Sequence, residues 1–132
     1  MRLYLAGRYT RYPQIEQYAI EARALGHEIT SRWHNGSHDL NSTSSDEDRE
    51  RLALEDLQDL FSARDGIVVF SAEQSGRGGY HVETGYAMGR RRQVYLVGPR
   101  RNVFHYLRAV RQFGTWEEFK SQVLIDNWLA WP

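Results

Sequence analysis

A single carboxylate, Glu83, lies about one turn into an expected helix that opens on Gly78 and Gly79 and follows the apolar run 66–71. A carboxylate in a first helical turn feels the positive end of the helix dipole, which favours its ionised form. An ionised carboxylate suits a nucleophile better than a proton donor. Acids in first turns also occur as simple capping residues, so the surrounding residues must decide between the two interpretations.

Other polar groups gather in segments that directly follow apolar runs: Arg8 and Arg11, residues 34–39, residues 75–79 and residues 100–102. Glycine-rich loops such as residues 75–79 can bind phosphate through backbone N–H groups. This loop lacks the Lys-Ser/Thr ending of a P-loop and the glycine spacing of a dinucleotide site, so we expect no triphosphate or NAD site. Its expected use is to let a ligand approach the backbone beside Glu83.

Apolar runs alternate with stretches of helical periodicity along the chain, which predicts an α/β fold. Strands are expected over residues 2–6, 28–33, 66–71 and 93–97, helices over 13–25 and 45–64, and a mobile surface loop over 35–45. Strands that are buried on both faces and separated by helices form parallel sheets with right-handed crossovers. We therefore expect one domain over residues 1–132, with a flavodoxin-like or Rossmann-like five-stranded parallel sheet flanked by helices. Ligands of such sheets bind beyond the carboxyl ends of the strands.

The last third of the chain shows helical spacing of apolar residues at two places, Val103, Leu107 and Val110, then Phe119, Val123 and Leu124. With Phe104 and Phe113, the first set forms an apolar stripe that a monomer of 132 residues would struggle to cover. Large aromatic residues add to the apolar surface of this region: Trp116, Trp128 and Trp131. We therefore expect an obligate homo-oligomer, at least a homodimer.

Composition limits the function. A chain of 132 residues with 41% hydrophobic content is expected to fold as one domain. Seventeen basic and seventeen acidic side chains cancel, so we expect a small-molecule substrate rather than a nucleic acid polymer or a membrane surface. The sequence has no cysteine, which excludes a disulfide scaffold, a thiol nucleophile and thiolate metal ligands. The short apolar start predicts no signal peptide, and no apolar run approaches the ~20 residues of a membrane span, so we expect a cytoplasmic protein.

Four segments resemble the nucleoside 2-deoxyribosyltransferase superfamily: residues 4–7 (Tyr-Leu-Ala-Gly), 56–70, 79–87 (Gly-Tyr-His-Val-Glu-Thr-Gly-Tyr-Ala) and 94–98 (Val-Tyr-Leu-Val-Gly). That superfamily includes base-exchanging transferases and hydrolases of 2′-deoxynucleoside 5′-monophosphates. The resemblance implies cleavage or transfer at an N-glycosidic bond, without metal or redox cofactor. The alternative is a non-catalytic nucleotide-binding or sensing module of the same fold, but a sensor needs no ionised carboxylate aimed at the sugar.

The resemblance also assigns roles to individual residues. Glu83 matches the nucleophile, which would form a covalent glycosyl intermediate, and Tyr4 matches the tyrosine that hydrogen-bonds it. The sugar-binding aspartate falls on Asp56. The interval from Asp56 to Asp65 is one residue longer than usual in the family, so Asp59, one helical turn later, is a rival.

Two further assignments concern the ends of the substrate. Asn102 resembles an asparagine that the neighbouring subunit lends toward the 5′ end of the substrate. Glu73 is the nearest candidate for the acid that protonates the leaving base, and a solvated loop charge is the alternative.

Four residues near the expected strand ends complete the predicted substrate site. Gly7 and Gly79 are expected to let the substrate approach the backbone closely. Arg8 and Arg11 are expected either to clamp a 5′-phosphate or to face solvent.

Aromatic and histidine side chains around the expected strand ends have competing interpretations. Trp33, His34 and Tyr80 would either sandwich a nucleobase or pack at the rim. His34 and His38 have a metal-ligand spacing, with His27 or Asp39 as a third ligand, but a polar loop without cysteines argues against a metal site.

Overall fold

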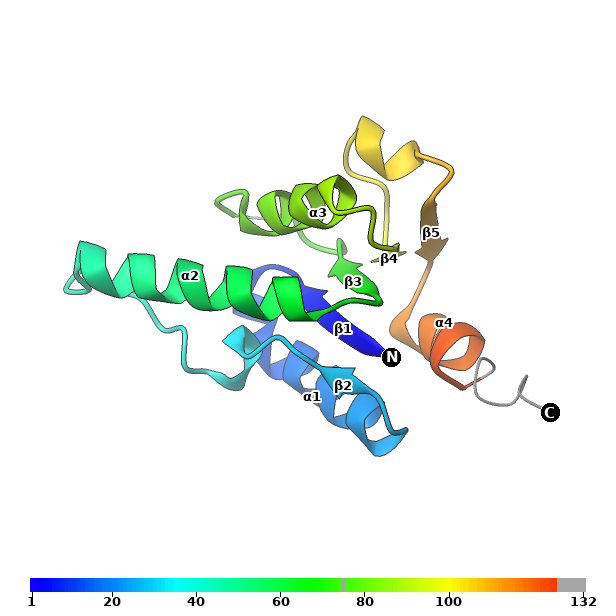
Figure 1. Ribbon diagram of the computed structural model, residues 1–132, viewed down its shortest axis with the longest axis horizontal. Coiled ribbons are helices and arrows are strands. Elements are labelled where there is room, and N and C mark those ends of the chain that lie inside the picture. The colour runs from blue at the N-terminus through cyan, green and yellow to red at the C-terminus, as the bar shows by residue number, and fades with distance from the viewer. Residues whose placement is uncertain (75, 126–132) are drawn as a thin grey trace.

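In the computed structural model, which describes residues 1–74 and 76–125, five parallel strands form one sheet with helices on both faces (Figure 1). The strand order is β2-β1-β3-β4-β5. The strands are β1 (Arg2–Ala6), β2 (Glu28–Ile29), β3 (Gly66–Phe70), β4 (Val94–Val97) and β5 (Val110–Phe113). All four pairings are parallel, so the predicted fold class is confirmed.

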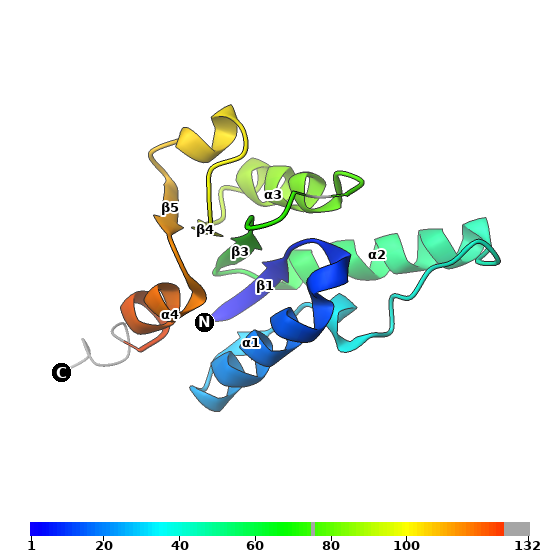
Figure 2. The same ribbon diagram turned by 180° about the vertical axis from the view of Figure 1, so that it is seen from behind.

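Helices α2 (Asp46–Ser62) and α3 (Gly79–Gly89) cover one face of the sheet. Helices α1 (Tyr12–Ala24) and α4 (Trp116–Phe119) cover the other, as the view from behind also shows (Figure 2). A turn of π-helix, Lys120–Ile125, continues α4. Short 3-10 turns follow three strands: Tyr9–Arg11, Trp33–Asn35 and Val103–Tyr106. Within the described ranges, no helix combines the length and the apolar character needed to cross a membrane.

Local sequence signals explain where the two long helices begin. Helix α1 has Pro13 in its first turn, where the missing N–H costs nothing. Helix α2 begins with a capping box, in which Ser45 Oγ accepts from the Asp48 backbone N–H at 3.0 Å and Asp48 Oδ2 accepts from the Ser45 N–H at 3.1 Å. These caps fix the start of the helix that carries Asp56.

The predicted second strand is shorter than expected. Pairing with β1 ends after Thr30, whose N–H donates to the Leu3 carbonyl at 2.9 Å. Beyond it the Trp33 indole N–H, rather than a backbone N–H, donates to the Leu5 carbonyl at 2.6 Å. The Trp33 side chain therefore occupies the position that the next backbone N–H of a paired strand would take. The chain then turns into the 3-10 helix Trp33–Asn35.

The helix expected from Val103, Leu107 and Val110 is wrong. Val103 lies in a single 3-10 turn capped by Asn102, whose Oδ1 accepts from the Phe104 N–H at 2.9 Å, and Val110 begins β5. In β5 only Val110 and Phe113 are buried, because the strand lies at the edge of the sheet. The two outer residues of this run of four are buried and the two inner ones are exposed. Such a run lacks the alternation of buried and exposed residues that would distinguish a strand from a helix. Trp128 and Trp131, part of the expected interface, lie outside the described residues.

Candidate active site

Strand register places Tyr4 on the face of the sheet that α2 and α3 cover. Tyr4 lies opposite Ile67 and Leu5 opposite Val68, and side chains alternate between faces along each strand. Asp56 comes from α2 and Glu83 from α3. Asp56 raises the pKa of both Tyr4 and Glu83, so the three side chains lie within electrostatic reach of one another. The structure therefore brings together the three residues to which the sequence assigns catalysis.

Glu83 is half-buried as a residue, but its Oε2 atom is fully buried. Burial raises the pKa of Glu83 from 4.5 to about 8, the Tyr4 hydroxyl lowers it and Asp56 raises it. The expectation that the helix dipole keeps this carboxylate ionised is therefore wrong for the unliganded protein. Desolvation disfavours a charge by more than a helix end, worth about 0.3–1 kcal/mol at an exposed position, favours it.

The Tyr4 hydroxyl and the Glu83 carboxyl form an unsatisfied buried pair. Within residues 1–74 and 76–125, neither Tyr4 Oη nor Glu83 Oε2 has a hydrogen-bond partner of ordinary geometry. Burial first, and then Glu83, raises the pKa of Tyr4 well above its ordinary value of 10.0. Leaving a buried polar atom unpaired costs about 1–3 kcal/mol, and such atoms are rare in folded proteins. Buried polar groups with perturbed pKa values cluster at functional sites, which makes this pair a candidate.

The two rival aspartates on α2 have different environments. Asp59 is buried at 6% exposure and is bound by Arg32, whose Nη2 lies 2.8 Å from Oδ1 and whose backbone N–H donates to Oδ2 at 3.1 Å. Asp56 keeps 27% of its side chain exposed and lies 3.0 Å from His38 Nε2. Burial raises the pKa of Asp56 to about 6, and His38 lowers it. Asp59 is thus committed to a structural ion pair, while Asp56 faces Tyr4 and Glu83.

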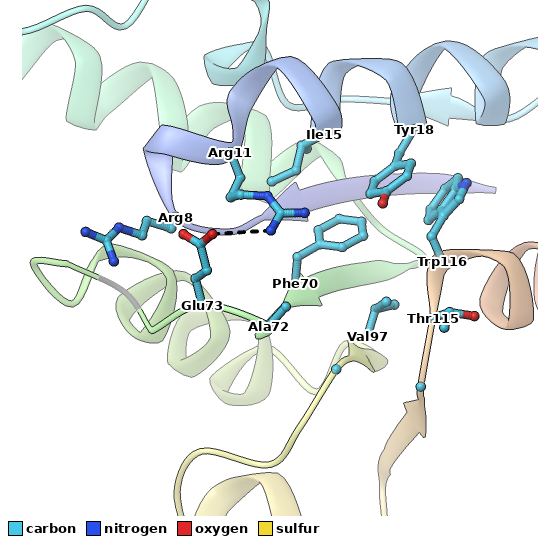
Figure 3. Close-up of a pocket in the computed structure, with 12 residues that line it drawn as sticks. Arg8, Arg11, Ile15, Tyr18, Phe70, Ala72, Glu73, Val97, Thr115 and Trp116 are labelled. Atoms are coloured by element: carbon cyan, nitrogen blue, oxygen red, sulfur yellow. Dashed lines mark hydrogen bonds and ion pairs between the residues drawn. The ribbon is translucent and has the colours of Figure 1, made fainter.

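A cavity of about 190 Å³ lies on the opposite face of the sheet, between α1 and the segment that joins β5 to α4 (Figure 3). Phe70 and Val97, which lie side by side in register, contribute to its lining. The ring of Tyr18 stacks on both Phe70 and Trp116, with centroids 5.2 Å and 4.7 Å apart. The cavity is therefore separate from the cluster of Tyr4, Asp56 and Glu83.

Charged groups line the end of this cavity that is away from Trp116 (Figure 3). Arg11 Nη1 lies 3.3 Å from Glu73 Oε1. Arg8 lies against the glycine-rich loop, where a Cβ added to Gly76 would be 3.8 Å from Arg8 Nε, and its guanidinium makes no hydrogen bond or ion pair with the described residues. The resemblance suggested Glu73 as the acid at the base, and Arg8 and Arg11 were expected either to clamp a 5′-phosphate or to face solvent, but the structure places all three in one cavity. Glu73, already engaged by Arg11, is poorly placed as a separate acid at the base.

The two glycines expected at the substrate have different surroundings. A Cβ on Gly7 would lie 2.7 Å from Ile15 Cδ1 and 3.4 Å from Phe70 Cβ, so Gly7 allows α1 to pack against the sheet. A Cβ on Gly79, the first residue of α3, would meet nothing within 4 Å among the described residues. Space for a ligand is therefore open at Gly79, whereas Gly7 has a packing role.

The aromatic residues expected to sandwich a base are buried. Trp33 is 5% exposed, His34 1% and Tyr80 1%, so none of them offers a face to a ligand. Tyr80 Oη donates to the Glu73 carbonyl at 3.2 Å. Tyr9, which sequence reasoning missed, is 36% exposed and stacks on Tyr12 with ring centroids 5.3 Å apart. Its position shortly after the first strand, beside Arg8, is the signal that could have identified it.

The histidines considered as metal ligands are bound to other groups. His34 Nε2 lies 2.7 Å from Ser31 Oγ, and its Nδ1 contacts the Glu16 carboxylate. His27 lies 2.9 Å from the N-terminal amine and 3.0 Å from the Leu124 carbonyl. Among residues 1–74 and 76–125, no three His, Asp or Glu side chains are grouped as metal ligands would be.

No family model matches the sequence, and no curated protein matches it. Solved structures do match. The 2-deoxyribosyltransferase of the psychrotolerant bacterium Bacillus psychrosaccharolyticus superposes with a TM-score of 0.70 at 21% identity, over 91% of this chain and 90% of that one. The CMP N-glycosidase BcmB of Clostridium botulinum superposes with a TM-score of 0.61 at 17% identity, over 98% and 99%. The chain shares its fold with both. At these identities the likeness establishes the fold, which is the one that the sequence resemblance implies.

Asn102 lies at the border of an exposed apolar surface. Its Nδ2 atom is 3.5 Å from His81 Nδ1 in the first turn of α3. Around it, several apolar residues have more than half of their surface exposed: Val82 (68%), Val103 (76%), Phe104 (62%), Tyr106 (70%) and Leu107 (51%). We call these five residues the α3 patch. Exposed large apolar side chains on neighbouring segments are typical of an interaction surface.

Proposed function

We propose that the protein cleaves or transfers at the N-glycosidic bond of a 2′-deoxynucleoside or its 5′-monophosphate, through a covalent glycosyl intermediate on Glu83. The observation that carries this proposal is the convergence of Tyr4, Asp56 and Glu83 from three elements, with Tyr4 Oη and Glu83 Oε2 buried and without a hydrogen bond of ordinary geometry among the described residues. The fold shared with a 2-deoxyribosyltransferase and a CMP N-glycosidase supports it.

The chemistry needs a carboxylate on the face of the sugar opposite the base. Breaking an N-glycosidic bond passes through an oxocarbenium-like state, which Glu83 stabilises and then captures at C1′. The positive charge that develops at C1′ favours the ionised form of Glu83 at the moment when it is needed. Tyr4 orients that carboxylate, and Asp56 accepts hydrogen bonds from the sugar hydroxyl. Water or a second base then releases the sugar.

Incubation of the protein with the common deoxynucleosides and deoxynucleotides, with and without a free acceptor base, tests the proposal. Release of free base, followed by chromatography, indicates a hydrolase, and appearance of a new nucleoside indicates a transferase. Binding of these compounds without any turnover would instead favour the nucleotide-sensing module.

Arg8 is expected to bind a 5′-phosphate, because it lies against the glycine-rich loop that leads into α3, the helix of Glu83, and no described side chain engages its guanidinium. Replacement by glutamine should then reduce the preference for a monophosphate over its nucleoside by roughly ten- to hundredfold, the value of a charge-assisted hydrogen bond. The same replacement of Arg11, which already binds Glu73, is the matched control and should have a smaller effect. Equal kcat/KM of the wild-type protein on both substrate forms would assign Arg8 to solvent.

The protein is expected to be an obligate homo-oligomer in which Asn102 completes the site of a neighbouring subunit. The α3 patch lies beside Asn102 and supplies the apolar surface for such an interface. Two inactive variants, Glu83→Ala and Asn102→Ala, should regain activity when mixed, up to roughly a quarter of the wild-type sites for statistically exchanged dimers. Sedimentation measures the oligomeric state of the protein. A fully active monomer would refute the shared site, as would variants that exchange subunits without regaining activity.

A further inference from the structure

We propose that His38 is a positioning residue for Asp56, whose carboxylate it holds in the charged, fixed orientation that a sugar hydroxyl requires. This inference rests on the proposed function for the sugar, but the contact between the two side chains does not. The sequence indicated only a surface loop over residues 35–45, with His38 considered as a metal ligand.

The geometry is that of a close contact between a buried imidazole and a partly exposed carboxylate. His38 is 8% exposed although it lies in a polar loop, and its Nε2 is 3.0 Å from Asp56 Oδ1. Glu55, the neighbouring acid on α2, is farther away at 4.0 Å. Neither His38 Nε2 nor Asp56 Oδ1 has an aligned hydrogen bond within the described ranges, so a small rotation of the carboxylate, as on ligand binding, would complete one. A carboxylate has two oxygens, and contact at Oδ1 leaves Oδ2 for a ligand.

The other nitrogen of the imidazole supports this orientation. His38 Nδ1 lies 3.1 Å from Ser37 Oγ. A hydroxyl that donates to Nδ1 leaves the ring proton on Nε2, which faces Asp56. The imidazole therefore presents an N–H donor to Asp56 even when it is neutral.

The surroundings explain why Asp56 needs such a partner. Burial raises the pKa of Asp56 to about 6, Asp59 and Glu55 raise it further, and His38 opposes all three. Without His38, a larger fraction of Asp56 would carry a proton at neutral pH, and a protonated carboxyl accepts hydrogen bonds less strongly. The charged or titratable groups that face the pair come from several elements: Glu55 and Asp59 on α2, Arg32 after β2, Tyr4 on β1 and Glu83 on α3.

A titration of the folded protein tests the contact without any substrate. The carbon-13 shift of the Asp56 carboxyl, followed by NMR against pH, should report a midpoint that moves upward by about one pH unit in His38→Ala, because a favourable partner of the charged form is lost. The Glu55→Gln variant is the control and should move the midpoint slightly downward, since it removes a like charge. An unchanged midpoint in a folded His38→Ala protein would overturn the proposal.

Kinetics then test the positioning role. On the best deoxynucleotide substrate, His38→Ala should raise KM roughly tenfold and change kcat much less, since the lost interaction is with the bound sugar. His38→Gln, which keeps an N–H donor, should recover most of the loss. In an Asp56→Asn background, His38→Ala should have no further effect. An equal effect of His38→Ala in both backgrounds would show that the histidine merely anchors the loop.

The two proposals fail in distinguishable ways. If the wild-type protein turns over no deoxynucleotide, the proposed function fails, and the NMR titration still decides whether His38 governs the charge of Asp56. If turnover is found and the titration midpoint does not move, the positioning role fails and the proposed function stands.

Discussion

Replacing Glu83 with glutamine should reduce turnover of a deoxynucleotide by roughly 10⁴-fold or more, because the proposed nucleophile is lost. The amide has nearly the same shape, so the fold should stay intact, as circular dichroism and thermal unfolding would show. Base release by chromatography measures the loss. A 2′-fluoro analogue of the substrate, which slows the second step, should leave a sugar adduct that mass spectrometry locates on the peptide containing Glu83.

The control for this experiment is a glutamate on the opposite face of the sheet. Glu117 on α4 has a side chain that is 72% exposed, and Glu117→Gln should leave base release unchanged. Glu73→Gln adds a second comparison, because Glu73 is engaged by Arg11 in the separate cavity and is expected to matter less than Glu83. Near-normal base release by a folded Glu83→Ala protein would end the covalent mechanism.

The sequence predicts the parts of the fold that local rules determine. Apolar runs identified the four strands from β1 to β4, and the Ser45–Asp48 box identified the start of α2. Strand β5 was missed because it is an edge strand with only two buried residues, so its pattern matches a helix as well as a strand. The early end of β2 depends on the Trp33 indole, a contact between segments that no periodicity reveals.

The candidate site, like the fold, could be predicted from the sequence only in part. The family resemblance selected Tyr4 and Glu83 and left Asp56 and Asp59 as rivals, and the fold places Asp56 within electrostatic reach of the other two. The burial of the Glu83 carboxyl could not be predicted from the sequence. A first-turn position predicts an ionised Glu83, but the charge is governed by the packing of α3 against β1. The exposure of the aromatic residues could not be predicted from the sequence either. Tyr9 is exposed near the end of β1, whereas Trp33 and Tyr80 are buried.

The pH dependence of the reaction should reveal this burial. In the proposed mechanism the carboxylate of Glu83 is the active form, and the pKa of Glu83 is about 8, so kcat/KM should rise about tenfold per pH unit below 8 and level off above it. Because the pKa of Asp56 is about 6, the slope should steepen toward hundredfold per unit at lower pH. Initial rates at low substrate concentration, measured across this range, check the profile. A plateau that already begins near pH 5 would show that Glu83 is ionised in the free protein.

Stability supplies an independent measure of the same pKa, and its sign follows from linkage. A group whose pKa rises from 4.5 in the unfolded chain to about 8 in the folded protein stabilises the fold fully below 4.5, and that contribution is lost as pH rises to 8. At 1.36 kcal/mol per unit the loss amounts to a few kcal/mol, since the half-buried position of Glu83 reduces the full value. Glu83→Gln removes the titration, so the variant should gain stability relative to the wild-type protein as pH rises from 5 to 9. Thermal unfolding of both proteins measures this difference. A constant difference in Tm across that range would mean that Glu83 titrates alike in the folded and unfolded states, and the rise in kcat/KM would then need another group.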